Sequence, residues 1–183
     1  LWMTENRYVA GSQTPVAPTV TVTSVVPGLT NQKTFKVNYT ASGIAKSKTF
    51  TLVEGDNKTL SITETDTAGN VTILMFPTVK LDTTVPAGSL LINSGAMFTN
   101  QGQVTLTLAG TDTGSGIGTM SFSTDNAAWT APETFAASKT FTLPAVDGLK
   151  TVCVKYFDKA GNAGVIYSRT ITLDTTPPAV AVT

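Results

Sequence analysis

Apolar and polar residues alternate with a period of two along several short stretches of the chain. The sequences VTVT at 20–23 and VTLTL at 104–108 show the pattern clearly. Successive side chains of a β-strand point to opposite faces of a sheet, so this alternation predicts strands with one buried and one exposed face. No window repeats apolar residues at helical spacing over more than about two turns. The pattern therefore predicts an all-β protein.

The second half of the chain shows the expected strands most clearly. We predict six of them, at 89–93, 104–109, 119–123, 140–143, 151–157 and 165–173. Asp147-Gly148 separates the fourth strand from the fifth, because this dipeptide readily adopts the positive φ that tight turns need. Short strands at this density are typical of a sandwich of two antiparallel sheets.

The chain also contains an internal repeat. Four blocks occur twice in the same order: TNQ at 30–32 and 99–101, SKTFTL at 47–52 and 138–143, DTAGN at 66–70 with DKAGN at 158–162, and LDTT at 81–84 and 173–176. A repeat of this length indicates tandem copies of one structural unit. We therefore expect two units, at 17–85 and 86–176.

Both chain ends resemble parts of further units. The C-terminal residues 177–183 repeat the beginning of the first unit, so we interpret them as the first strand of a following repeat or as a donor strand. Residues 7–15 can be laid on 169–177, so residues 1–16 are interpreted as a leader or as the last strand of a preceding repeat. The chain is thus expected to come from a longer array.

Within the second unit, DTGSGI at 112–117 and STDNAAW at 123–129 precede DKAGN at 158–162 and DTTPP at 174–178. In this combination the chain resembles the bacterial immunoglobulin-like repeats of large surface and secreted proteins. The resemblance implies tandem immunoglobulin-like Greek-key β-sandwiches and an extracellular or bacterial cell-surface location. It implies no particular ligand, because such repeats occur in adhesins, in stalks and as accessory domains of enzymes.

Charge is low and balanced. Twelve basic and 12 acidic residues give a formal net charge of zero, and charged residues make up 13% of the chain. Proteins that bind nucleic acid ordinarily carry a basic patch, and a membrane-spanning helix needs about 18 or more consecutive apolar residues. The sequence has neither feature. We therefore expect no nucleic acid partner and no membrane insertion in this segment.

The chain has no histidine and a single cysteine, Cys153. Histidine is the commonest general base, and its absence removes Ser-His and Cys-His pairs. We therefore expect no catalytic residues and no enzyme activity. Cys153 cannot close an intrachain disulfide. Because it lies between Val152 and Val154 in a predicted strand, it faces away from them, and we expect it to be accessible rather than buried.

The first unit is shorter than the second. Only 33–46 separate its TNQ and SKTFTL blocks, whereas 102–137 lie between those blocks in the second unit and include the expected strand 119–123. In an immunoglobulin-type sandwich that strand pairs beside the strand before the DxAGN turn, so its loss leaves 59–65 as an open edge. Two explanations remain open. The edge is covered by a loop or blunted by charge, or a strand from a neighbouring chain completes the sheet.

Several oxygen-bearing side chains are expected to meet at one end of the second unit, where three connections between strands come together. These side chains are Asp82 from the linker, Asp112, Asp158 and Asn162. Calcium binds about 6 to 8 oxygen ligands of this kind. The sequence therefore predicts a calcium site, with no other cofactor. The alternative is that DKAGN only forms a turn. No site is expected in the first unit, where Asp66 and Asn70 lack acidic neighbours.

We interpret the chain as a structural or adhesive repeat of a bacterial surface protein, stalk or fibre. The linker 82–86 is short and ends in proline, so neighbouring units are expected to lie end to end. The partners would be adjacent repeats, copies of the chain in a fibre, or a surface protein or glycan.

One alternative is a filament subunit assembled by strand donation. Another is a carbohydrate-binding module of a secreted enzyme, in which Trp129, Phe135 and Tyr167 form an aromatic platform; as core residues they would have no such role.

Overall fold

The computed structural model describes residues 16–180, and in this range the chain consists of strands, loops and one 3₁₀ turn at Asn93–Gly95. No helix in the described range is long and apolar enough to cross a membrane. The chain divides into two compact units, 16–28 with 33–79 and 29–32 with 80–180. This division falls at 79/80, ahead of the expected boundary at 85/86. The predicted fold class is confirmed: the protein is all-β.

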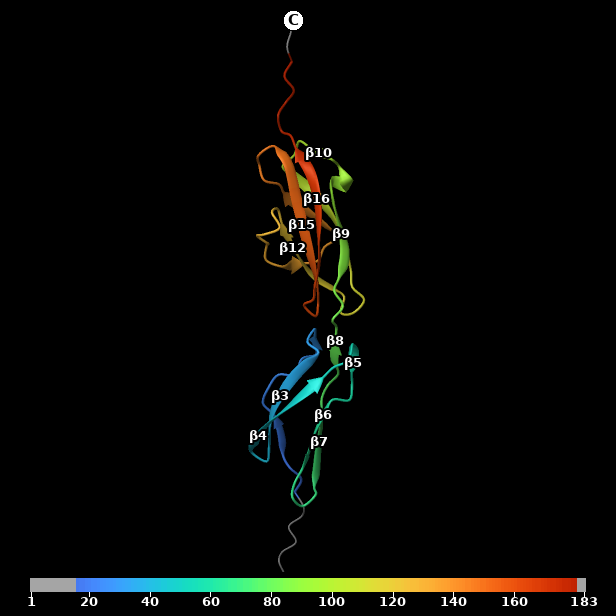
Figure 1. Ribbon diagram of the computed structural model, residues 1–183, viewed down its shortest axis with the longest axis vertical. Helices are drawn as coiled ribbons and strands as arrows, with labels where there is room; N and C mark the ends of the chain where they lie inside the picture. Colours follow the sequence, from blue (N-terminus) through green and yellow to red (C-terminus); the bar gives the residue numbers. More distant parts are fainter. Residues whose placement is uncertain (1–15, 181–183) are drawn as a thin grey trace, which may run out of the picture. The chain divides into compact units, whose positions relative to one another are not determined.

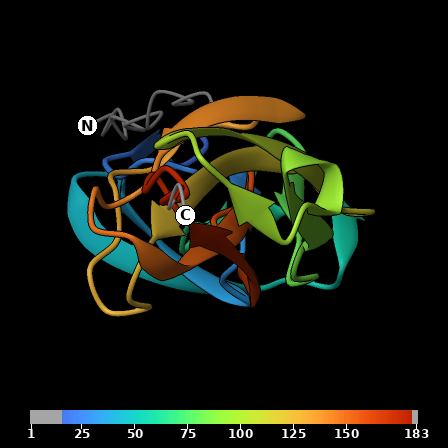
Figure 2. The same cartoon turned by 90° about the horizontal axis from the view of Figure 1, so that it is seen from above.

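The second unit is a sandwich of two sheets, and Figure 2 looks at it from above, along the strands. One sheet has the order β14-β11-β9, with bounds Ser138–Thr142, Gln103–Thr111 and Ala87–Ile92. The other has the order β10-β16-β15-β12-β13 (Figure 1), with bounds Phe98–Thr99, Ala163–Leu173, Gly148–Asp158, Ile117–Ser123 and Glu133–Thr134. All six predicted strands are present. The two unpredicted strands, β10 and β13, have two residues each and are too short to show an alternation.

The core of this sandwich follows directly from the alternation in the sequence. On β11, Val104, Leu106 and Leu108 are buried, and the threonines between them face outward. Tyr156 of β15 and Phe122 of β12 are fully buried in the same cluster. Burying an apolar side chain of this size contributes about 1.5–3 kcal/mol to folding. The interior between the two sheets therefore holds this unit together.

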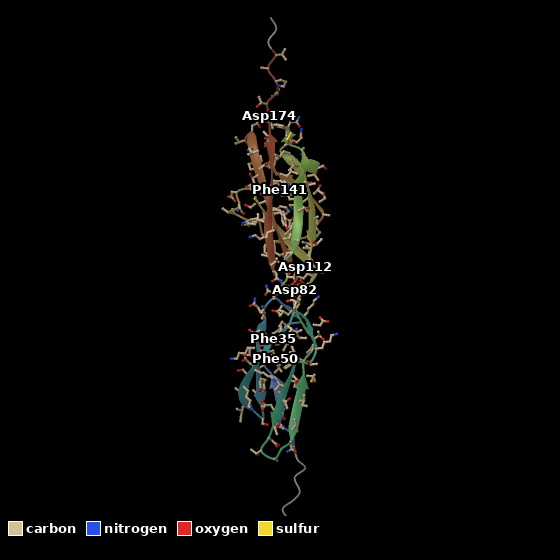
Figure 3. All side chains as sticks on the ribbon, turned by 45° about the vertical axis from the view of Figure 1, so that its right-hand side comes forward. Phe35, Phe50, Asp82, Asp112, Phe141 and Asp174 are labelled. Carbon is tan, nitrogen blue, oxygen red and sulfur yellow. The ribbon has the colours of Figure 1, made fainter. Side chains whose placement is uncertain are left out.

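The first unit has a sandwich of its own. One sheet has the order β1-β3-β4, with bounds Val20–Val22, Thr34–Ala41 and Ile44–Thr51, and the other pairs β6 (Ser61–Thr65) with β7 (Val71–Met75). Val37, Phe50 and Ile62 are buried between them. The rings of Phe35 and Phe50 stack with their centroids 5.3 Å apart (Figure 3). The smaller unit therefore also has its own core.

The repeated TNQ blocks accompany the same local structure in each copy. A three-stranded sheet has the order β2-β8-β5, with bounds Leu29–Thr30, Val79–Leu81 and Gly55–Asn57. Strand β2 runs parallel to β8, as β10 runs parallel to β16. Each short parallel strand enters its TNQ block, so the sequence repeat reproduces this pairing.

The two units differ at the strand before the DxAGN turn. In the second unit β15 is flanked by β12 and β16, whereas in the described part of the first unit β6 pairs with β7 alone. One edge of β6 therefore has no neighbouring strand among residues 16–180. Of the expected terminal strands, 177–180 form none, and residues 1–15 and 181–183 lie outside the described range.

Candidate metal centre

Three aspartates meet at one end of the second unit, and Figure 3 shows Asp82 and Asp112 there, with Asp174 at its other end. Asp82 follows β8, Asp112 follows β11, and Asp158 is the last residue of β15. One carboxylate oxygen from each lies within 4.8 Å of the others. The structure therefore brings together the three acidic residues that the sequence analysis selected.

Asp82 is fully buried although it belongs to the linker. Its Oδ2 accepts a hydrogen bond of 2.5 Å from the Ser115 amide, and its Oδ1 accepts one of 3.0 Å from the Thr84 amide. Burial raises the pKa of this carboxyl, but hydrogen bonds from Ser115 and Thr84 outweigh burial and leave the pKa below its ordinary value. Asp82 is therefore an anion at neutral pH, fixed at two oxygens.

Asp158 and Asn162 form the turn that the sequence predicts. Asp158 Oδ1 accepts the Asn162 amide at 2.7 Å, and Gly161 between them has a φ of 93°. The Asn162 side-chain nitrogen donates to Asp158 Oδ2 at 2.6 Å and to the Asp82 carbonyl at 2.8 Å. The nitrogen of Asn162 thus positions Asp158 and Asp82, and only its side-chain oxygen is chemically suited to bind a cation.

The surroundings of Asp112 favour a metal site over an ordinary turn. Its Oδ2 accepts hydrogen bonds from the Gly116 amide at 2.7 Å and the Gly114 amide at 3.1 Å. Its Oδ1 is the one buried side-chain oxygen or nitrogen without a hydrogen-bond partner in the described part of the chain. Leaving such an atom unpaired costs about 1–3 kcal/mol, and more for a charged group. A cation between the carboxylates would remove that cost.

The charges around the three aspartates also favour a bound cation. The salt bridges found among residues 16–180 join Lys46 to Glu64, Lys58 to Asp56 and Lys139 to Glu133, so none neutralises the three aspartates. Lys80, which lies nearby, donates instead to the Gly114 carbonyl at 2.8 Å. Carboxylates this close repel one another unless a cation or a proton is shared. The oxygen-only donor set suits Ca²⁺ better than a softer metal.

The first unit contains the same turn without the other carboxylates. Asp66 accepts the Asn70 amide at 2.8 Å and the Asn70 side-chain nitrogen at 2.8 Å, and Gly69 has a φ of 87°. Hydrogen bonds from Asn70, first its side chain and then its backbone, lower the pKa of Asp66. The DxAGN motif thus builds a turn in both units. The additional acidic residues Asp82 and Asp112 distinguish the second.

Gly114 is a residue of this centre that the sequence analysis did not identify. A Cβ placed on it would lie 2.2 Å from the Asp82 carboxyl carbon, so only glycine leaves room for that carboxylate. The GSG sequence at 114–116 indicates a loop. The need for glycine at 114 comes from the Asp82 carboxylate, which is distant in sequence.

We expect Gly114→Ala to displace the Asp82 carboxylate and to lower the free energy of unfolding by about 1–3 kcal/mol. Urea denaturation of the whole chain measures this loss. Gly102→Ala is the matched control, because a Cβ there has no atom within 4 Å. Equal midpoints for the two variants would show that the Asp82 carboxylate has room to shift.

The aromatic residues of the second unit are arranged as core rather than as a platform. The Phe135 and Tyr167 rings each lie 5.9 Å from the buried Tyr156 ring, and both pack against the core cluster. The Trp129 ring instead lies under the Lys155 ammonium, 4.5 Å from it. These contacts give Phe135 and Tyr167 a packing role, whereas the half-buried Trp129 makes a cation–π contact with Lys155.

The expectation that Cys153 is accessible is wrong, because only 3% of it is exposed. It faces away from Val152 and Val154 as predicted, but it pairs with Ser123 of β12 on one side and Ser168 of β16 on the other. Burial, followed by the nearby Asp125 charge, raises the pKa of its thiol. Alternation identified the correct face of the strand, but that face is covered.

Comparisons with known proteins yield similarities of fold. No family model and no curated protein matches the chain. Among solved structures, the chain resembles the fibronectin(III)-like modules of Clostridium thermocellum CbhA with 17% identity and a TM-score of 0.49, covering 85% of this chain and 94% of that one.

Two other solved structures are similar in part. The PKD1 domain of Vibrio anguillarum Epp is 13% identical, with a TM-score of 0.37 over 50% of this chain and 96% of that one. A tetra-tandem repeat in the extending region of a large adhesion protein is 18% identical, with a TM-score of 0.37 over 87% of this chain and 50% of that one. The fold itself defines the class: tandem immunoglobulin-like β-sandwiches, structurally similar to modules of bacterial proteins.

Proposed function

We propose that the chain is a structural repeat of a bacterial extracellular protein, in which Ca²⁺ bound by Asp82, Asp112 and Asp158 fixes the linker to the second unit. The observation that carries this proposal is the burial of Asp82, a linker residue, among loops of that unit. Linkers between independent domains are ordinarily exposed and flexible. A spacer instead needs a connection that keeps its direction.

The linker is held at its peptide groups as well as at its side chain. The Asp82 amide donates to the Thr30 carbonyl at 3.0 Å, and the Asp82 carbonyl accepts the Asn162 side chain at 2.8 Å. Without a cation, three like charges oppose this arrangement. Calcium would therefore strengthen a linker geometry that hydrogen bonds already define.

Small-angle X-ray scattering of the whole chain tests the spacer proposal. We expect the maximum dimension to be long and sharply defined with excess Ca²⁺, and the distribution of distances to broaden with excess chelator. Asp112→Asn should broaden it even in calcium. Asp125→Asn is the matched control, since Asp125 also accepts loop amides, from Ala127 and Ala128, but lies outside the cluster.

A scattering profile that is unaffected by calcium, chelator and Asp112→Asn would contradict the role of calcium in the linker. A compact chain in every condition would contradict the spacer function itself.

A filament subunit assembled by strand donation is the second candidate. One observation favours it: in the described residues, one edge of β6 has no neighbouring strand. Edges that nothing covers accept strands in β-augmentation, so a donated strand would have to displace any side chain that covers this edge. Electron microscopy of concentrated protein separates the candidates, because filaments support donation and dispersed particles support the spacer.

A further inference from the structure

The open edge of β6 is defined by alternate backbone groups. The Leu60 carbonyl accepts the Phe76 amide at 2.9 Å, so even-numbered residues of this strand direct their backbone groups toward β7. The backbone groups of Ser61, Thr63 and Thr65 therefore face the open edge. Their side chains are short and uncharged, which does nothing to discourage another strand.

Two exposed lysines of the opposite sheet reach this edge. Lys48 of β4 donates from Nζ to the Ser61 carbonyl at 2.9 Å. Lys46, two residues earlier on the same face of β4, forms an ion pair of 2.5 Å with Glu64 of β6. Opposite them on β3 lie the buried residues Val37 and Tyr39, so both lysines are on the core face of their strand.

Glu64 is held in place by a second contact. The Tyr39 hydroxyl donates to Glu64 Oε1 at 2.7 Å while Lys46 binds Oε2. The Lys46 ammonium, and after it the Tyr39 hydroxyl, lowers the pKa of the Glu64 carboxyl. The charged pair is thus fixed on the inner side of the edge strand.

In the second unit the residue equivalent to Lys48 lies beside a sheet in which the corresponding strand, β15, is paired with β12. Lys139 has the place of Lys48 in the repeated SKTFTL block. There β12 pairs with β15, and the Lys139 ammonium lies 5.4 Å from the Phe122 ring of β12 and 2.7 Å from Glu133. Lys139 therefore covers the Phe122 side chain of a paired strand in the second unit. The equivalent Lys48 binds the unpaired edge of β6 in the first unit.

Two further positions of the repeat are charged in the first unit and uncharged in the second. Lys46 stands where the second unit has Ala137, and Glu64 stands where it has the buried Tyr156. In the second unit Met120 and Phe122 of β12 fill the interior beside Tyr156. In the second unit the Tyr156 position thus makes apolar contacts with β12. In the first unit the two positions form the Lys46–Glu64 ion pair instead, which does not require a neighbouring strand.

We propose that Lys46 and Lys48 close the β6 edge against strand addition, and that a second copy of this chain pairs with that edge when they are removed. Two β6 edges related by a two-fold axis are self-complementary, because each offers the same outward backbone groups in antiparallel order. An incoming strand would have to displace Lys48 from the Ser61 carbonyl. It would also place its inward side chains against two ammonium groups.

Sedimentation velocity of the full chain tests the proposal with the double variant Lys46→Thr/Lys48→Thr. Threonine keeps a strand-forming residue and removes the charge. We expect a folded dimer whose self-association is at least about tenfold tighter than that of the wild type, which stays monomeric. Lys33→Thr/Lys36→Thr is the control, since it removes the same charge from exposed positions of the same unit that lie outside β4, and it should stay monomeric.

A third change locates the contact. Thr63→Pro in the double variant removes an amide that faces the open edge and leaves the β6–β7 ladder intact, so it should restore the monomer. Circular dichroism establishes that each variant is folded. A folded double variant that stays monomeric at every concentration overturns the proposal. So does a wild-type protein that already dimerises through β6, or a dimer that Thr63→Pro leaves unchanged.

Discussion

Calcium is expected to stabilise the second unit and to leave the first unit unchanged. A ligand that binds only the folded state at 100 times its dissociation constant adds about 2.7 kcal/mol to the free energy of unfolding. For a unit of this size the increase corresponds to a rise of roughly 11–22 °C in melting temperature. The reason is local: calcium would pair the Asp112 Oδ1 atom and neutralise the repulsion among three carboxylates.

Hydrogen exchange followed by mass spectrometry provides the measurement, because it reports on both units in one sample. Amides of β15 should exchange more slowly with Ca²⁺ than with chelator, whereas amides of β3 should exchange equally in both. Asp112→Asn should abolish the difference, and Asp125→Asn should preserve it. Equal protection of β15 in calcium and in chelator would mean that the cluster serves only the turn and the linker.

Gly88→Ala is expected to destabilise the second unit more than any other glycine-to-alanine change considered. A Cβ on Gly88 would lie 2.4 Å from the Ala109 carbonyl oxygen and 2.4 Å from the Tyr156 ring. The ring cannot move away easily, because Tyr156 is fully buried and its hydroxyl donates to the Ser89 carbonyl at 2.6 Å. Overpacking of this kind costs about 1–3 kcal/mol and sometimes more, and we expect about 3 kcal/mol.

Urea denaturation measures this loss, with Gly102→Ala as the control in the same unit. A Cβ at Gly102 meets nothing within 4 Å, so that variant should match the wild type or gain about 0.4–1 kcal/mol from a less flexible unfolded chain. A Gly88→Ala protein as stable as the control would show that β9 shifts without cost. It would also mean that Tyr156 packs less tightly than its contacts indicate.

The sequence was sufficient to predict the six longer strands of the second unit and the meeting of the aspartates. Both follow from rules that act along the chain: alternation determines which residues face inward, and the order of strands determines which loops share an end. Asp82, Asp112 and Asp158 therefore come together as expected from the topology. Calcium itself stays a prediction.

Other features depend on neighbours that are distant in sequence. Gly114 is required because the Asp82 carboxylate lies against it, and nothing near Gly114 in the sequence indicates that contact. The burial of Cys153 depends on what lies over its face of the sheet, which alternation does not report. The direction of Lys48 depends on which strands flank β6: among residues 16–180 no strand lies on that side, and the ammonium donates to the Ser61 carbonyl.

The parallel pairing of β10 with β16 has a mechanical consequence for the second unit. Asp82 and Asp174 lie at opposite ends of that unit (Figure 3), so a pull on the chain draws β10 and β16 in opposite directions along their common axis. The bonds between them are then loaded in shear and must break together rather than one after another. Asp147, which binds the Thr175 hydroxyl at 2.8 Å and the Thr176 hydroxyl at 3.0 Å, carries part of the same load where the chain leaves the unit. A module of this build would resist tension much better than a hairpin peeled open from one end.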